Sequence, residues 1–222
     1  MQPYILCEFD KFDNSEILDA LKKRALQNKG LKFKLYEIAG ITLGRDAEEW
    51  IRSEWKKYAV GSLSDFSDCL SLCLEPKEGF ELYLKKLKKI TSPTDLSEEI
   101  LGLSQFHSSE ALLWIENNIN RVKDITPEWG ELAFESGLDW NAAKKWIKLG
   151  KPLSLVSLDA LERSVTYVDE NFKSKKLDAD TLEKKLNLDS ILELKTTLQD
   201  HLTENNTKRV RDRVNSILEK CS

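Results

Sequence analysis

A repeat of 31 to 32 residues runs through the middle of this chain. At an offset of 32, residues 100–115 align with residues 132–147, and at an offset of 31, residues 69–84 align with residues 100–115. Each copy contains an apolar helix, a short turn and a second helix that ends in an aromatic and an aliphatic residue. This period and pattern indicate helical hairpins that stack on their neighbours.

The turns carry residues that favour the start of a helix. The second helices are preceded by Glu75-Pro76, by Ser108-Ser109 after His107, and by Asp139. Asp and Ser side chains cap exposed backbone N–H groups, and Pro suits the first helical turn. We therefore expect a helix to begin at each of these three positions.

Further helices are expected on both sides of the repeat, because only five prolines and nine glycines interrupt the chain. Asp13 and Glu16 give a capping-box-like start to a helix. Its apolar stripe is Ile17, Leu18, Leu21 and Leu26. The other expected helical segments are 46–59, 152–168 and, after a longer loop, 178–188, followed by a last pair at 189–202 and 205–221.

Residues 1–60 leave two alternatives open. Leu31, Phe33 and Leu35 alternate with polar residues, which is typical of a strand that could pair with residues 3–9. The other possibility is an irregular helical hairpin that caps the stack.

The hairpin pattern over residues 61–222 resembles the HEAT/armadillo class of α-solenoids. This resemblance implies an all-α fold of stacked helical hairpins, with residues 1–60 as an N-terminal cap and 61–222 as the helical-repeat domain. It implies no functional residues, because it rests on architecture and not on a motif. Such a stack offers a long groove for a partner without needing catalytic residues.

The start of the chain has neither the basic beginning nor the long apolar core of a signal peptide. No apolar run approaches the length that spans a bilayer. We therefore expect a cytoplasmic protein that contacts no membrane. Cys69 and Cys73 lie four residues apart on one helical face, as half of a metal site would, but buried apolar packing explains them more simply.

No motif for phosphate binding, nucleophilic catalysis or metal hydrolysis is present. Gly40 and Gly44 are not followed by the Lys-Ser or Lys-Thr of a phosphate loop. We expect no cofactor, no metal and no catalytic residue, although carboxylates from distant segments could still meet in a groove and form an enzyme site.

The net charge of −4 is distributed unevenly. Residues 61–139 contain seven basic and 15 acidic residues. Acidic side chains in the first helices of the repeats would share one side of the stack and attract a basic partner. Trp129 is the expected apolar anchor among them, with Trp140 beside it, although either could instead belong to the core. The expected partner-binding residues are Glu98, Glu99, Glu128, Trp129, Glu131, Glu135 and Trp140.

Tyr83, Trp114 and Trp146 share one repeat position, so we interpret them as packing residues. Of the four tryptophans at 114, 129, 140 and 146, we expect Trp114 and Trp146 to be shielded and Trp129 or Trp140 to be accessible.

An alternative surface is basic. It consists of lysines in the second helices and of arginines near the start of the last helix, where they oppose the helix dipole. A neighbouring acidic helix would offset the charge of these arginines, and a phosphate or an acidic partner is their functional alternative. Together with the lysines they are the candidate nucleic-acid-binding residues. The residues concerned are Lys85, Lys88, Lys144, Lys148, Arg209, Arg211 and Arg213.

The sequence thus favours a protein-binding helical-repeat module, most concretely an immunity-type protein that neutralises a basic partner such as a nuclease toxin. The alternative is a nucleic-acid-binding or base-acting HEAT-like protein such as a DNA glycosylase. The acidic net charge counts against that alternative.

Overall fold

The structure is a computed structural model. It describes residues 12–58, 63–122, 125, 129–130, 140–168, 174–176 and 178–221. The chain divides into two compact units, and each is described by itself. The N-terminal unit comprises residues 1–106 and 120–123, and the C-terminal unit comprises 107–119 and 124–222. The division expected at residue 60 falls inside the N-terminal unit.

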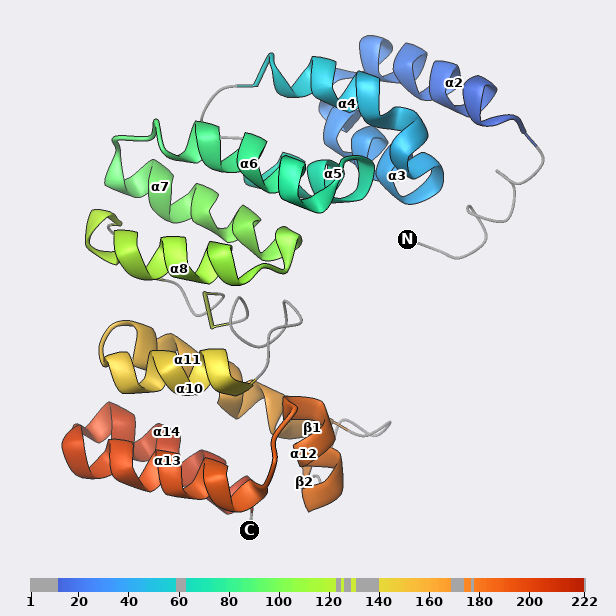
Figure 1. Ribbon diagram of the computed structural model, residues 1–222. Helices are drawn as coiled ribbons and strands as arrows, with labels where there is room; N and C mark the ends of the chain where they lie inside the picture. Colours follow the sequence, from blue (N-terminus) through green and yellow to red (C-terminus); the bar gives the residue numbers. More distant parts are fainter. Residues whose placement is uncertain are drawn as a thin grey trace. The chain divides into compact units, whose positions relative to one another are not determined.

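The N-terminal unit is built around α5, which contacts α3, α4, α6 and the 3₁₀ segments η2 and η3 (Figure 1). Helix α2 packs on α3, and α7 contacts η3. The elements are α2 (Asn14–Gln27), η1 (Lys29–Leu31), α3 (Lys32–Leu43), η2 (Gly44–Ala47), α4 (Glu48–Trp55), α5 (Ser64–Cys73), α6 (Pro76–Leu87), α7 (Pro93–Glu99) and η3 (Ile100–Phe106).

In the C-terminal unit, α11 packs against α10 and α14, and α13 contacts α10, α12 and α14. The short strands β1 and β2 pair antiparallel, with Tyr167 opposite Lys175. The elements are α8 (Ser109–Asn118), α10 (Trp140–Leu149), α11 (Leu153–Ser164), β1 (Thr166–Val168), β2 (Ser174–Lys176), α12 (Ala179–Leu186), α13 (Ile191–Glu204) and α14 (Lys208–Lys220). The 3₁₀ turn η4 (Ile119–Arg121) follows α8.

Apart from the β1–β2 pair, the regular elements in the described part of the chain are helical, so the all-α class is confirmed. The expected helix starts are also confirmed where they are described. Helix α6 begins at Pro76 after Glu75. Helix α8 begins at Ser109, and the Ser108 hydroxyl accepts the backbone N–H of Ala111 at 3.2 Å. Asp139 lies outside the described residues, but α10 begins at the next position.

The strand hypothesis for residues 31–38 is wrong, because these residues form η1 and α3. The alternation of Leu31, Phe33 and Leu35 does not mark one buried face, since Tyr36 and Ala39 are buried with Leu35 while Leu31 is exposed. The proposed partner segment, residues 3–9, lies outside the described residues.

Three further differences concern helix boundaries and faces. Leu26 is 80% exposed, because the buried stripe of α2 runs through Ile17, Leu21 and Ala25. Helix α11 ends at Ser164, and the following Thr166–Val168 is a strand, in keeping with its β-branched residues. Residues 100–106 form the 3₁₀ segment η3 instead of an α-helix.

Aromatic rings fill the core of the N-terminal unit. The fully buried Tyr36 and Phe66 lie with their ring centroids 5.0 Å apart and connect α3 to α5. Trp55 stacks on Tyr83 at 5.9 Å and connects α4 to α6. Tilted and stacked ring contacts of this kind stabilise a core beyond the area that they bury.

Helices α3 and α5 lie side by side and run in the same direction. Phe33 contacts Phe66, Gly40 faces Leu72, and Arg45 pairs with Glu75, so the two helices advance in step. Their offset is close to the repeat period of the sequence. Of the two alternatives for the first 60 residues, the helical one is therefore what the described residues show, with Tyr36 of α3 and Trp50 of α4 in edge-to-face contact at 5.2 Å.

Tryptophan and small residues form the core of the C-terminal unit. Trp129, Trp140 and Trp146 are all buried. Helix α11 is buried on most of its circumference, and its small residues allow a close approach. A Cβ added to Gly130 would collide with the backbone carbonyl of Val156 and lie 2.6 Å from the Cβ of Ala160.

His201 of α13 is a buried histidine, and burial lowers its pKa against the opposing influence of Glu204. An unfolded histidine has a pKa of about 6.5. Below that value the unfolded chain binds a proton that the folded chain does not, so the free energy of unfolding should fall as the pH falls.

We therefore expect acidification from about pH 7 to about pH 5 to destabilise the protein by up to about 1 kcal/mol per pH unit. Chemical denaturation across this range measures the slope. His201→Asn should reduce it, because the burial of this histidine causes the slope. An unchanged slope in His201→Asn would contradict this assignment.

Candidate partner-binding surface

The tryptophans expected as exposed contacts are buried. Trp129 is 0% exposed and Trp140 is 2% exposed, so neither can serve as a surface anchor in this structure. Trp146 is also buried, and its indole Nε1 donates to the carboxylate of Glu116 at 2.9 Å. Trp114 is partly exposed. The expected order of accessibility is therefore wrong: of the four tryptophans, the one that reaches solvent is Trp114.

The two neighbouring acids at the end of α7 have different roles. Glu98 is exposed, as expected of a contact residue. Glu99 is 2% exposed, and its carboxylate accepts the backbone N–H of Ser64 at 2.7 Å. This bond places a negative charge at the start of α5, where the helix dipole favours it. Glu99 is therefore a structural residue and not a surface contact.

The remaining acidic residues of the expected surface are Glu128, Glu131 and Glu135. They lie outside the described residues, so their prediction stays open.

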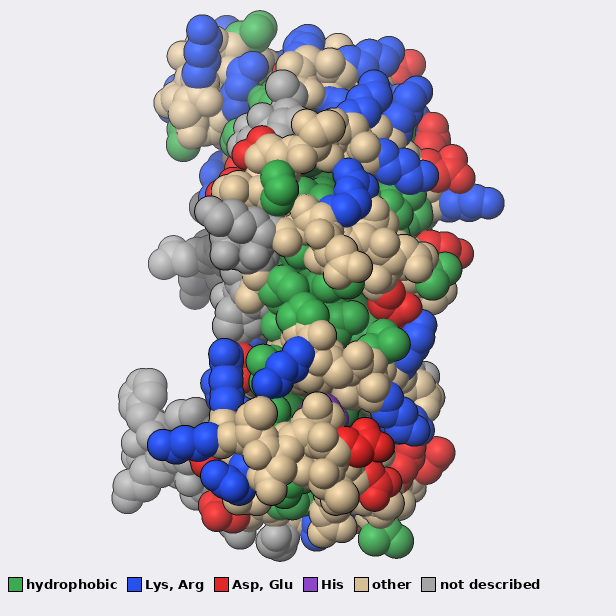
Figure 2. All heavy atoms as spheres, turned by 90° about the vertical axis from the view of Figure 1, so that its left-hand side faces the viewer, with side chains coloured by type: hydrophobic (Ala, Val, Ile, Leu, Met, Phe, Trp, Pro, Cys, Tyr) green, Lys and Arg blue, Asp and Glu red, His purple; other side chains and the backbone are tan. Residues whose placement is uncertain are grey.

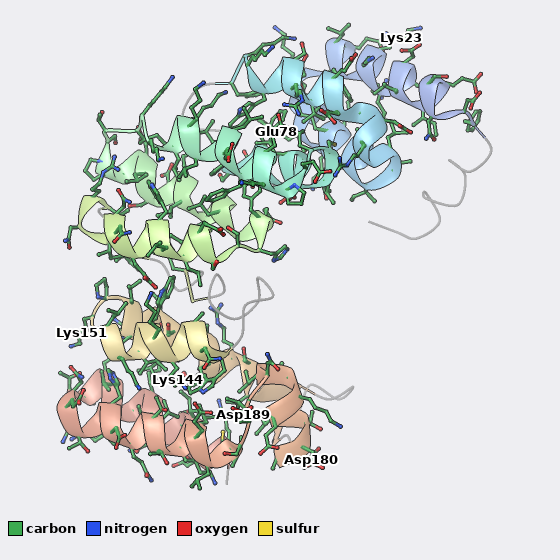
Figure 3. The ribbon with its side chains drawn as sticks, in the orientation of Figure 1. Lys23, Glu78, Lys144, Lys151, Asp180 and Asp189 are labelled. Atoms are coloured by element: carbon green, nitrogen blue, oxygen red, sulfur yellow. The ribbon has the colours of Figure 1, made fainter. Side chains whose placement is uncertain are left out.

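The lysines of the alternative surface differ in their availability. Lys85 is exposed on α6 and Lys88 is exposed directly after it, both in the N-terminal unit. In the C-terminal unit Lys148 is exposed, but Lys144 donates to the carboxylate of Glu193 across the α10–α13 contact (Figure 3). This hydrogen bond lowers the pKa of Glu193. Lys144 is thus engaged inside the fold.

The basic start of α14 faces acidic residues of α11. Arg213 Nε lies 2.7 Å from the carboxylate of Asp159 and Arg209 lies 3.8 Å from it, and Arg213 also pairs with Glu162. Burial would raise the pKa of Glu162, but hydrogen bonds from Ser216 and Arg213 outweigh it and lower the pKa. The expected acidic neighbour helix is therefore present.

An open hollow of about 530 Å³ lies at the same place. Both signs of charge line the hollow, which is formed by Glu162, Lys208, Arg209, Asp212 and Arg213.

Arg211 lies on another side of α14 and does not line the hollow. Its guanidinium donates to the side chain of Asn206 at 3.3 Å.

A different surface combines exposed apolar and acidic side chains on α3 and α5. We call it the α3–α5 surface and define it by Glu37, Ile41, Asp68 and Leu72. Ile41 is 48% exposed and Leu72 is 44% exposed. A Cβ at Gly40 would lie 3.0 Å from Leu72 Cδ1, so glycine at this position lets Leu72 lie across α3. Two large apolar side chains thus meet the solvent where the two helices pack.

One turn earlier the same two helices carry acidic residues. Burial raises the pKa of Asp68, and the nearby negative charges of Glu37 and Asp65 raise it further. Lys34 pairs with Glu37 at 3.0 Å and lowers the pKa of Asp68. Among the described residues no lysine or arginine forms a salt bridge with Asp68. The acidic end of the surface therefore keeps an excess of negative charge.

Sequence reasoning did not single out this surface. Ile41 and Leu72 are 31 residues apart and look like ordinary core residues of two amphipathic helices. The one available signal was the glycine at position 40, which leaves room for a side chain of a neighbouring helix.

Opposite charges are mixed elsewhere on the molecule. The face drawn in Figure 2 carries lysine and arginine side chains together with aspartate and glutamate, and apolar side chains also reach the solvent there. In the N-terminal unit, Arg52 of α4 pairs with Glu48 at 2.7 Å and with Glu78 of α6 at 2.5 Å (Figure 3). Many of the basic residues thus contribute to the fold.

Cys69 and Cys73 are buried and free, as the packing interpretation predicted. Burial raises the pKa of both thiols, that of Cys73 to about 12. Across the described residues, no three His, Cys, Asp or Glu side chains are grouped as metal ligands would be. Within that same part of the chain, no helix is long and apolar enough to cross a membrane.

Comparison with protein-family models, curated proteins and solved structures gives no match.

Proposed function

We propose that this chain is a protein-binding helical module that neutralises a basic partner, as an immunity-type protein does. The observation that carries the proposal is the α3–α5 surface, where Ile41 and Leu72 are exposed beside the acidic Glu37 and Asp68. Apolar side chains in a polar rim are typical of protein contact sites. The negative charge beside them favours a positively charged partner.

We further propose that the helical hairpins stack in the manner of HEAT repeats. The parallel packing of α3 and α5 supports this within the N-terminal unit, because equivalent helices of successive repeats lie side by side in such a stack. Tyr83 and Trp146 are both buried at the shared repeat position, so two of its three residues agree with a repeated packing unit, whereas Trp114 is partly exposed.

The proposal is tested with a partner captured on the immobilised chain from the cells that produce it. The double variant Glu37→Lys, Asp68→Lys should slow association of that partner about tenfold or more at low salt. Glu81→Lys, Asp19→Lys is the matched control, because both acidic residues are exposed in the same unit and the change in net charge is equal.

Added salt should slow association of the partner with the unmodified chain much more than dissociation, because charges are screened beyond about 10 Å at about 0.1 M. Equal effects of the two double variants would contradict the proposed surface. Reversal of Glu128, Glu131 and Glu135 to lysine tests the acidic segment that the sequence predicted. A captured partner that is acidic, or a nucleic acid, would contradict the proposed function.

A nucleic-acid-binding or base-acting role is the second candidate, and the hollow at the start of α14 favours it. Lys208 and Arg209 are exposed there. Asp159 and Glu162 neutralise part of this charge, so we rank this function second. It predicts that alanine at Lys208, Arg209 and Arg211 weakens binding to duplex DNA and reduces its salt dependence.

A further inference from the structure

The geometry of the α3–α5 surface restricts the kind of segment that can bind there. Helices α3 and α5 run in parallel, so equivalent turns of the two helices face the solvent together. Glu37 lies near Asp68, Gly40 faces Leu72, and Arg45 pairs with Glu75. The surface is therefore a row of paired positions, or steps, along the line where the two helices meet, which we call the valley.

Two of these steps differ in chemistry. Glu37 and Asp68 form an acidic step, and Ile41 and Leu72, each four residues later, form an apolar step. Four residues of an α-helix rise by about 6 Å. The Arg45–Glu75 ion pair closes the apolar end of the valley with charges that already compensate each other.

We infer that this valley docks an amphipathic α-helix of the partner, which presents a lysine or arginine and a leucine-sized side chain one turn apart. The inference rests on the proposed function and names the partner element. A helix laid along the valley repeats its residues i and i+4 at the same 6 Å spacing as the two steps. Its apolar side chain covers Ile41 and Leu72, and its basic side chain meets Glu37 and Asp68.

The chemistry of the steps supports a helix with these two residue types. Ile41 and Leu72 together offer an apolar contact that a single leucine covers, as in other sites where a helix binds in a groove. Asp68 is raised in pKa by burial and by its acidic neighbours, and a partner cation would relieve that repulsion. A neutral or acidic helix would leave these carboxylates uncompensated.

The test uses a synthetic helical peptide of about 18 residues, since shorter helices are marginally stable in water. Lysine and leucine alternate along one face of this peptide at i and i+4. A second peptide has the same composition in a shuffled order that leaves no such face. Fluorescence anisotropy measures the binding of each peptide to the full chain.

We expect the patterned peptide to bind at least about tenfold more tightly than the shuffled one. Ile41→Asn, Leu72→Asn should weaken its binding about tenfold or more. Leu26→Asn is the matched control, because Leu26 is an exposed leucine on α2, and it should change the affinity less than about twofold. Circular dichroism confirms that the variants are folded.

The same variants separate this inference from the proposed function. Neither peptide binding, or both binding equally, would show that the inference of a docked helix is wrong. If Ile41→Asn, Leu72→Asn still abolishes capture of the natural partner, the α3–α5 surface remains the proposed binding site. If the patterned peptide binds equally to all variants, the valley is not its site. If neither peptide binding nor partner capture responds to the variants, both proposals are wrong.

Discussion

Replacing Trp146 with alanine should destabilise the C-terminal unit by about 3–5 kcal/mol. The indole is fully buried on α10, and its Nε1 donates to Glu116 of α8. Alanine would leave a cavity and would also remove the bond that joins the two helices. Chemical denaturation monitored by circular dichroism measures the change.

Trp114→Ala is the matched control for this prediction. Trp114 occupies the equivalent repeat position on α8, belongs to the same unit and is partly exposed. Its side chain fills less of the core, so Trp114→Ala should lower the free energy of unfolding by about half as much as Trp146→Ala, or less. Equal losses in the two variants would show that the packing at this position is shared and that exposure does not distinguish the two residues.

Gly130→Ala should destabilise the same unit by about 2–3 kcal/mol. The added methyl group would meet the backbone carbonyl of Val156, which a small side-chain rotation cannot move away. Alanine favours a helix over glycine by up to about 1 kcal/mol, which offsets part of the overpacking.

Gly30→Ala is the matched glycine substitution. A Cβ at Gly30 would meet its nearest neighbour, Asn28 Oδ1, at an ordinary distance of 3.6 Å. We expect the free energy of unfolding of this variant to stay within about 0.5 kcal/mol of that of the original chain, or to rise slightly. A loss as large as that of Gly130→Ala would mean that general loss of glycine flexibility, and not the contact with α11, causes the effect.

The local parts of the fold were predictable from the sequence. Pro76 and Ser108 mark helix starts because the cap depends on residues within three or four positions. The packing role predicted for Tyr83 and Trp146 agrees with their burial, whereas Trp114 at the same position of the sequence repeat is partly exposed. The helical form of residues 31–38 was left open against a strand, because it depends on packing against α5, as in the contact of Tyr36 with Phe66.

The candidate site depended on contacts between distant residues and could not be predicted in the same way. An exposed aromatic site and a buried one have the same local sequence, so Trp129 could belong to either until the packing of Gly130 against α11 was known. Glu98 and Glu99 are adjacent, but the buried one is fixed by Ser64, which lies 35 residues earlier. Ile41 and Leu72 form one surface because α3 and α5 pack in register, and this packing joins residues that are far apart in the sequence.

The carboxylate of Glu99 has a consequence for the order in which the chain acquires structure during synthesis. Ser64 and Tyr83, which both bond to Glu99, leave the ribosome before it does. Until Glu99 emerges, the first turn of α5 lacks the carboxylate that accepts from Ser64, and the Tyr83 hydroxyl lacks its acceptor, the backbone carbonyl of Glu99. Helices α5 and α6 can form earlier, but their final packing waits until the end of α7 has been synthesised.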